Sequence, residues 1–244
     1  MRREMDVIAN NLANANTAGF QGDKMLFREH LKRVNAHETL RRAERMSFVQ
    51  DIGQVRDTKQ GPLHFTGEEL DIAIQGEGYL TVETPLGPRY TRNGRLQVNT
   101  DGELVTPTGL KVLGDNGASL RIPQGAEQIK FNPNGLVEAR LPAVGGAFPV
   151  FQAVGRIQIV TFENQQEMRQ SERGLFLGAG EAIPSQDARI AQGLVEESNV
   201  QPIFEITRMI DVTRSFASGN SMLESEHERQ RKMIQTMGRA SANA

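Results

Sequence analysis

The chain has 244 residues, of which 38% are hydrophobic and 24% are charged, with a net charge of −2 and no Cys. This length and composition exclude wholesale disorder and a small disulfide-dependent scaffold. The near-neutral charge leaves no global field for nucleic acid or an anionic membrane, and the lack of Cys excludes disulfides, thiolate metal sites and cysteine nucleophiles.

Residues 1–20 predict an N-terminal helix with one narrow apolar stripe. The stripe recurs four and three positions apart, which places it on one side of a helix, at Met1, Met5, Ile8, Leu12 and Ala15. We expect Gly19 to end this helix, because glycine accepts the left-handed conformation found at many helix C-termini. The stripe is already in phase at Met1, so we expect the helix to begin upstream of that residue.

Residues 21–59 predict a partly extended connector, because their apolar pattern fits neither a helix nor a strand. The stretch 28–45 is locally basic, with three acidic residues against Arg28, Lys32, Arg33, Arg41, Arg42 and Arg45. Only Phe27 is a neighbouring aromatic, so there is no platform on which bases would stack. A subunit-docking or solvated face is favoured over a nucleic-acid site.

Residues 60–195 predict a central antiparallel β domain, because short apolar runs alternate with glycine-containing turns. The pairs Asn93-Gly94 and Asp101-Gly102 are hairpin signals, since both central positions of a type I′ turn need positive φ. We expect Asn93-Gly94 to join strands at 89–92 and 95–98. One short helix is expected near residues 164–173.

Residues 196–244 predict a long C-terminal helix that starts near Pro202. One heptad position reads Ile206, Thr213, Asn220, His227 and Ile234, and its partner reads Met209, Phe216, Leu223, Gln230 and Met237. Such a polar seam is expected to be shared by several helices, including copies from other chains. Both terminal helices are expected to become ordered only on association, because isolated helices with narrow seams gain little stability.

These patterns together predict an α+β fold, in which the N- and C-terminal helices form a coiled-coil-like layer beside the central antiparallel β domain. The residues expected at the interface between subunits are Met5, Ile8, Leu12, Ile206, Met209, Thr213, Phe216, Asn220 and Leu223.

The sequence patterns that would indicate a catalytic, cofactor-binding or metal site are weak. The Gly76-Glu77-Gly78 string lacks the third glycine of a dinucleotide fingerprint, no Gly-Lys pair offers a P-loop, and the four His lack metal-ligand spacing. No cofactor or metal is therefore expected. The acids at 68–71 and 196–197 are interpreted as solvated surface or capping residues. The alternative is a cell-wall carbohydrate hydrolase that uses Glu69 or Asp71.

Four strings, in order along the chain, resemble signatures of the bacterial flagellar rod and hook proteins. They are residues 8–20 (IANNLANANTAGF), 61–79 (GPLHFTGEELDIAIQGEGY), 90–94 (YTRNG) and 192–200 (QGLVEESNV). Two places depart from the family pattern. Gln21 stands where Lys or Arg is usual, and Glu68-Glu69 stands where Asn-Pro is commoner.

The resemblance implies a structural subunit of the periplasmic basal-body rod, of the proximal type, with the distal rod or the hook as the alternative. It implies export by the flagellar type III apparatus without a cleaved signal, and helical assembly with copies of itself and other rod proteins. The terminal helices would form an inner tube and the β domain an outer layer, and the rod would carry torque from motor to hook. Membrane insertion is not expected, because the most apolar window, 143–155, is about half a span and contains Pro149.

Overall fold

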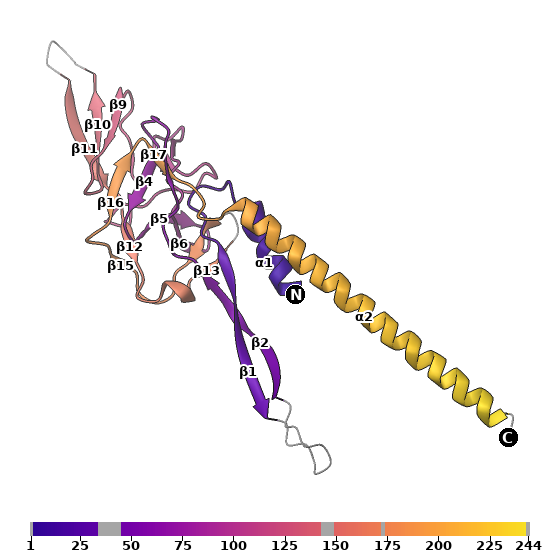
Figure 1. Ribbon diagram of the computed structural model, residues 1–244. Coiled ribbons are helices and arrows are strands. Elements are labelled where there is room, and N and C mark those ends of the chain that lie inside the picture. The colour runs from indigo at the N-terminus through magenta and orange to yellow at the C-terminus, as the bar shows by residue number, and fades with distance from the viewer. Residues whose placement is uncertain (1, 34–44, 143–148, 172–173, 243–244) are drawn as a thin grey trace. The chain divides into compact units, whose positions relative to one another are not determined.

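A computed structural model shows two helices and a β-rich body (Figure 1). The structure describes residues 2–33, 45–142, 149–171 and 174–242, and for residues 27–33, 45–52 and 235–242 it describes the backbone alone. The chain divides into two compact units. The helical unit comprises residues 1–13 and 201–244, and the β unit comprises residues 14–200.

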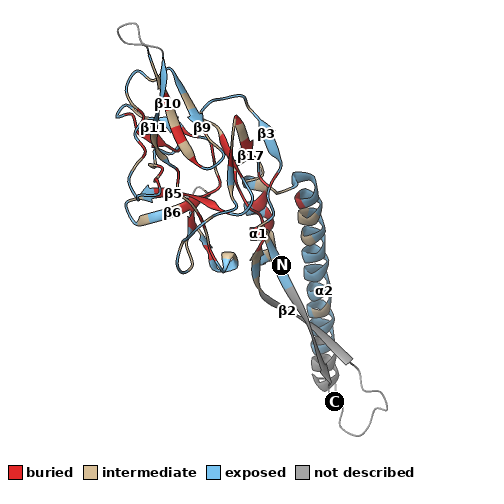
Figure 2. Ribbon diagram, turned by 90° about the vertical axis from the view of Figure 1, so that its left-hand side faces the viewer, coloured by how far each residue is buried: buried red, intermediate tan, exposed pale blue. Residues whose placement is uncertain are grey.

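The helical unit consists of α1 (Arg2–Ala13) and α2 (Pro202–Ala242), which contact each other. The predicted start of α2 at Pro202 is confirmed, and proline suits that position because its missing N–H would be unpaired in a first turn anyway. Figure 2 shows α2 exposed along most of its described length. Within the described residues, no helix is long and apolar enough to cross a membrane.

In the part of the chain that the structure describes, the β unit contains the strands and the short 3₁₀ helix η1. In chain order these are β1 (Asp23–Arg33), β2 (Arg45–Arg56), β3 (Leu63–Phe65), β4 (Ile72–Gln75), β5 (Tyr79–Thr84), β6 (Gly87–Thr91), β7 (Gln97–Val98), β8 (Leu104–Val105), β9 (Gln128–Phe131), β10 (Leu136–Leu141), β11 (Val150–Arg156), β12 (Ile159–Thr161), η1 (Gln165–Glu167), β13 (Arg169–Gln170), β14 (Phe176–Leu177), β15 (Ile183–Pro184), β16 (Arg189–Gln192) and β17 (Leu194–Glu196).

Every strand pair in the described residues is antiparallel, which confirms the expected class of sheet. The largest sheet has the order β13-β14-β6-β5-β12-β15, and a three-stranded sheet has the order β11-β10-β9. The pairs β16-β4, β17-β3, β7-β8 and β1-β2 are separate ladders. The expected α+β fold is thus confirmed, whereas the coiled-coil-like layer stays a prediction. The short helix expected near residues 164–173 is the single turn η1.

Strand β5 separates two apolar cores, because side chains of a strand alternate between its faces. Leu80 and Val82 belong to the larger core, which extends through β4, β9, β10 and the loops after β8. Tyr79 belongs to a smaller aromatic core, in which its ring meets that of Phe176 edge-on at 5.5 Å. With both faces covered, β5 anchors the β unit, and Figure 2 shows burial concentrated around it.

The segment expected to be a partly extended connector contains the long ladder β1-β2. Its register runs from Asp23 opposite Arg56 to Arg33 opposite Arg45, with one irregularity after Leu26. The basic side chains singled out between residues 28 and 45 lie outside the residues whose side chains are described.

The prediction that Asn93-Gly94 forms a two-residue hairpin turn is wrong. Strand β6 ends at Thr91 and pairs with β5 and β14, whereas the residues after Gly94 pair elsewhere. Gly94 does not adopt positive φ. Its N-terminal neighbour Asn93 instead caps a local turn, in which its side-chain oxygen accepts the N–H of Arg95 at 3.0 Å.

Gly94 is required for a different reason, the close approach of two backbones. The Ile72 N–H donates to the Gly94 carbonyl at 2.9 Å, and a Cβ added at Gly94 would lie 1.7 Å from the Ile72 carbonyl oxygen. The Asp101-Gly102 signal, by contrast, is confirmed. It lies in the loop 99–103 that joins β7 to β8, and Gly102 has a φ of +79°.

Glu103 closes that loop with a cluster of hydrogen bonds. The carboxylate accepts from Lys111 at 3.1 Å, from Ser119 at 3.0 Å and from Asn99 at 3.3 Å. The hydrogen bond from Lys111 is the main reason that the pKa of Glu103 is lowered from 4.5 to about 2. The ionised carboxylate therefore stabilises the folded loop.

Gly94→Ala should lower the free energy of unfolding of the β unit by at least about 2 kcal/mol, because the new methyl group would overlap backbone that cannot rotate away. Gly87→Ala is the matched control. Gly87 has a φ of +98° but no atom within 4 Å of an added Cβ, so only strain of about 1 kcal/mol is expected. Urea unfolding measures both, and equal losses would refute the close-approach argument.

Glu103→Gln should remove part of the acid sensitivity of the protein. A lowered folded-state pKa stabilises the protein above the unfolded value of 4.5, and that stability is lost as pH falls toward about 2. The unfolding midpoint of the unsubstituted protein should thus fall more steeply than that of Glu103→Gln over this window. Parallel curves for the two proteins would show that the Glu103 cluster does not contribute.

Candidate functional site

The residues expected at the interface between subunits all lie in the helical unit. On α1, Ile8 is buried, and Met5 and Leu12 are half-buried. On α2, Met209 is half-buried, and the other five are exposed. These are Ile206, Thr213, Phe216, Asn220 and Leu223. We call the six α2 residues the seam row.

The seam row leaves large apolar side chains in water. Ile206 is 45% exposed, Phe216 39% and Leu223 61%. Thr213 turns its hydroxyl back to the Met209 carbonyl at 2.7 Å, which satisfies it within the helix and presents its methyl group. The row is therefore more apolar at its surface than its sequence suggests.

A second exposed row on α2 was missed by the sequence reasoning. Phe204, Met222 and Met233 are 66%, 68% and 57% exposed. Their spacings of 18 and 11 residues are close to whole numbers of helical turns, so they share one face, which lies roughly 100° around the helix from Leu223 and on the side opposite Ile206. A search for heptads does not detect such spacings, whereas a search at 11 and 18 residues would have found them.

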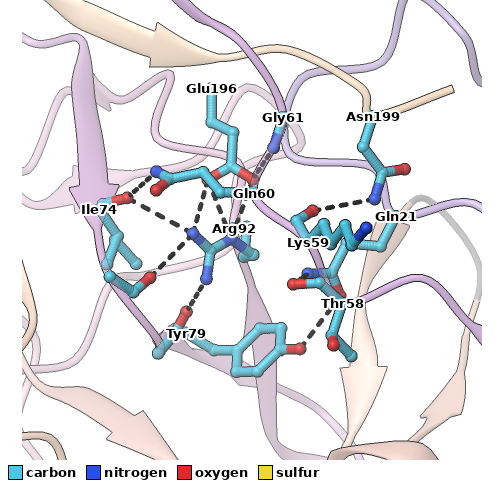
Figure 3. A network of polar contacts seen from close by, with 12 residues as sticks. Gln21, Thr58, Lys59, Gln60, Gly61, Ile74, Tyr79, Arg92, Glu196 and Asn199 are labelled. Carbon is cyan, nitrogen blue, oxygen red and sulfur yellow. Dashed lines mark hydrogen bonds and ion pairs between the residues drawn. The ribbon is translucent and has the colours of Figure 1, made fainter. Parts of the chain in front are cut away.

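The β unit contains a buried ion pair between Arg92 and Glu196, shown in Figure 3. The side chains are 3% and 1% exposed, and the Arg92 Nη2 lies 2.7 Å from a Glu196 carboxylate oxygen. Arg92 Nε donates to the same carboxylate at 2.9 Å. A buried charge pair of this kind is tolerated only where its remaining donors and acceptors are also satisfied.

Backbone groups from two connecting loops satisfy most of the rest of the pair. Arg92 donates to the carbonyls of Gly78 at 2.9 Å and Gly76 at 3.2 Å. Glu196 accepts the N–H of Gly61 at 3.1 Å, and a Cβ at Gly61 would lie 2.1 Å from the Glu197 carbonyl oxygen. Glycine at position 61 thus lets the backbone reach the carboxylate.

The four strings identified in the sequence meet at this ion pair. Residues 61–79 supply the carbonyls and the Gly61 N–H, residues 90–94 supply Arg92, and residues 192–200 supply Glu196. Residues 8–20 supply Gly19, whose N–H donates to the Glu196 carbonyl at 2.8 Å. Residues from all four strings therefore belong to one network, although Gly19 and Glu196 are 177 positions apart in the sequence.

Gly19 does not end the first helix, so that prediction is wrong. Helix α1 stops at Ala13, six positions earlier. Gly19 has a φ of +68°, and a Cβ there would lie 2.4 Å from the Arg92 carbonyl carbon. Glycine is needed because the chain passes directly over the backbone of Arg92.

Gln21 departs from the family pattern and is fully buried. Its side-chain oxygen accepts the hydroxyl of Tyr79 at 3.0 Å, and its amide donates to the Thr58 carbonyl at 3.4 Å. Burial raises the pKa of Tyr79, so the hydroxyl stays protonated and able to donate. A neutral amide at position 21 thus satisfies a neutral phenol beside the Arg92 network.

The interpretation of the acid pairs is half right. Glu68 and Glu69 are exposed as expected and line an open groove with Asp71. Glu196 was expected to be solvated, and that is wrong, because it is buried against Arg92. Only Glu197 of that pair is exposed. Within the described residues, no group of three or more His, Cys, Asp or Glu is arranged to hold a metal ion.

Three family models match the chain. They are "Flagella basal body rod protein" at residues 1–21, "Flagellar hook protein FlgE/F/G D1 domain" at 73–139 and "Flagellar basal body rod FlgEFG protein C-terminal" at 191–236. The flagellar basal-body rod protein FlgF of Caulobacter vibrioides is 34% identical, with 98% of this chain and 94% of the relative covered. FlgF of Rhizobium meliloti is 28% identical, with 98% and 93% covered. FlgG of Bacillus subtilis is 30% identical, with 92% and 90% covered.

Arg92→Met and Glu196→Leu should each lower the free energy of unfolding by about 3–5 kcal/mol, because each leaves an uncompensated buried charge. The double variant should lose clearly less than the sum, since neither charge remains. Glu127→Gln is the control, because the Glu127–Arg140 pair is half-exposed and spans 4.0 Å, so about 0.5 kcal/mol or less is expected. Additive losses in urea unfolding would refute the coupling.

Proposed function

The chain belongs to the flagellar hook and basal-body rod protein family, and on that premise we propose that α1 and α2 of many copies pack side by side to build the rod. The protein is a structural subunit of the flagellar basal-body rod, where it assembles with other rod and hook proteins. The hydrolase alternative has no support among these relatives, which are rod proteins.

The exposed seam row of α2 carries this proposal. At 1.5 Å per residue, the 12 residues of α1 extend about 18 Å and the 41 residues of α2 about 62 Å, so α1 covers at most a third of its partner. Exposed contiguous apolar side chains on a long helix mark a surface that another helix covers. In a rod, that helix belongs to a neighbouring subunit.

Self-association into a helical tube follows from the same argument. A contact between different faces of identical chains generates an open helical filament when the rotation from copy to copy does not close a ring. The second row on α2, Phe204, Met222 and Met233, gives the helix a contact on another side, as a filament requires. Many such contacts in parallel would stiffen the shaft and carry torque from the motor to the hook.

The proposed layers follow, with shifted boundaries, the four segments expected from the sequence. Helices α1 and α2 form the inner layer. The β unit forms the outer layer, and it includes the expected connector 21–59 and residues 14–20 and 196–200 of the expected helical segments. Export through the flagellar type III apparatus also fits this design. Helices that are stabilised mainly by neighbouring copies are easily kept unfolded during passage.

Ile206→Asp combined with Phe216→Asp should leave the β unit folded and abolish incorporation into rods, because burying two unpaired carboxylates is strongly unfavourable. Basal bodies purified from a strain that lacks its own copy provide the measurement, by immunoblotting for the variant. Circular dichroism of the purified protein reports on the β fold.

Ser221→Asp combined with Ser225→Asp is the matched control for that experiment. It adds the same charge to exposed positions of α2 that lie between the seam row and the row of Phe204, Met222 and Met233, and should be incorporated. Normal incorporation of the Ile206 and Phe216 variant would refute the proposal that the seam row is an interface.

A further inference from the structure

The side chain of Asn199 joins two stretches of backbone within the β unit. Its oxygen accepts the N–H of Gly22 at 2.8 Å, and its amide nitrogen donates to the carbonyls of Asp57 at 2.7 Å and Lys59 at 2.9 Å. Figure 3 shows this amide beside Lys59 and Gln21. Both amide hydrogens and the oxygen are therefore used on backbone groups.

These partners are the two ends of the β1-β2 hairpin. Gly22 directly precedes β1 and Asp57 directly follows β2. The Asp57 N–H also donates to the Gly22 carbonyl at 2.8 Å, which continues the ladder to the residues that Asn199 grips. A single side chain thus holds both strands of the hairpin at its base.

The hairpin depends on its base for its direction. Within the described residues, β1 and β2 pair only with each other and join no larger sheet. Another side-chain clamp at the base, in addition to the ion pairs Lys24–Asp57 at 2.6 Å and Arg56–Asp23 at 3.8 Å, is Gln166 of η1. It accepts the N–H of Arg56 and donates to the Arg56 carbonyl, both at 3.0 Å, and so holds β2 alone.

Asn199 lies in the connection between β17 and α2, three residues after the strand and three residues before the helix. Its own N–H donates to the Phe20 carbonyl at 3.3 Å, which fixes the backbone at this point. The residue that grips the hairpin is therefore part of the short connection that leads into the rod-forming helix.

We propose that Asn199 is a positioning residue that sets the direction of the β1-β2 hairpin and ties it to the chain entering α2. A shift of the first turn of α2 would then be passed to the hairpin through one amide. The proposal rests on the proposed function for the role of α2, whereas the clamp itself is testable in the free protein.

The test uses spin labels on two introduced cysteines, which are unique because the chain has none. Ser47→Cys lies in β2, and Leu86→Cys lies in the exposed β5–β6 turn of the same unit. Asn199→Ala should broaden the distribution of distances between the labels and speed amide exchange at Gly22 about tenfold, because its hydrogen bond is lost. An unchanged distribution would overturn the proposal.

Asn199→Asp and Asn134→Ala separate positioning from general destabilisation. Aspartate keeps the acceptor for the Gly22 N–H but loses both donors. Exchange at Gly22 should therefore stay slow while the label distribution broadens, because β2 is released. Asn134 accepts one local hydrogen bond, from Leu136 at 3.1 Å, and its change to Ala should leave both readouts unaltered.

A thermal melt of each labelled variant completes the test. A positioning role is supported if the distribution of label distances broadens while the melting temperature stays nearly unchanged. The proposal is overturned if the distribution broadens only when the whole fold is lost in both Asn199 variants. The incorporation of the Ile206 and Phe216 double variant into rods does not depend on this result. Failure of the Asn199 clamp and failure of the proposed function can therefore be told apart.

Discussion

The ion pair between Arg92 and Glu196 is the contact on which the β unit depends. Two opposite charges are removed from water, and this is tolerable only because the guanidinium and carboxylate find backbone partners in every direction. Most of those partners come from loops, and the carbonyl of Ile74 in β4 is the exception. The pair therefore fixes the course of segments that strand pairing leaves undetermined, including the turn at Gly61 and the passage of Gly19 over Arg92.

The two units of the chain treat apolar surface in opposite ways. In the β unit, both faces of β5 are covered, so the cores are complete within one chain. In the helical unit, α2 has 41 residues and α1 has 12, so most of α2 extends beyond the length of α1. Several large apolar side chains of α2 are exposed. One unit is thus a complete fold, and the other keeps exposed apolar surface that we propose neighbouring subunits cover. This division suits a protein whose work is assembly.

Glycine shows how an ambiguous sequence signal is resolved by the fold. The sequence reading interpreted Gly19 and Gly94 as a helix end and a hairpin turn, because glycine often marks positive φ. The structure uses both for close backbone approach, where the absence of a Cβ matters, and Gly19 also has a φ of +68°. Gly102, which the sequence placed in a hairpin loop, has positive φ as well. Local pattern cannot distinguish these uses, since the atom that would clash belongs to a segment distant in sequence.

The sequence by itself determined the class of fold, the long helix from Pro202, the antiparallel character of residues 60–195 and, through four short strings, the family. These are properties of periodicity and composition, which act over a few neighbouring residues. The pairing of Arg92 with Glu196, the ladder β1-β2 and the grip of Asn199 on its base were decided by tertiary structure. Each of these contacts joins residues that are between roughly ten and 180 positions apart in the sequence. The residues next to a single acidic or amide side chain do not indicate which distant group it will contact.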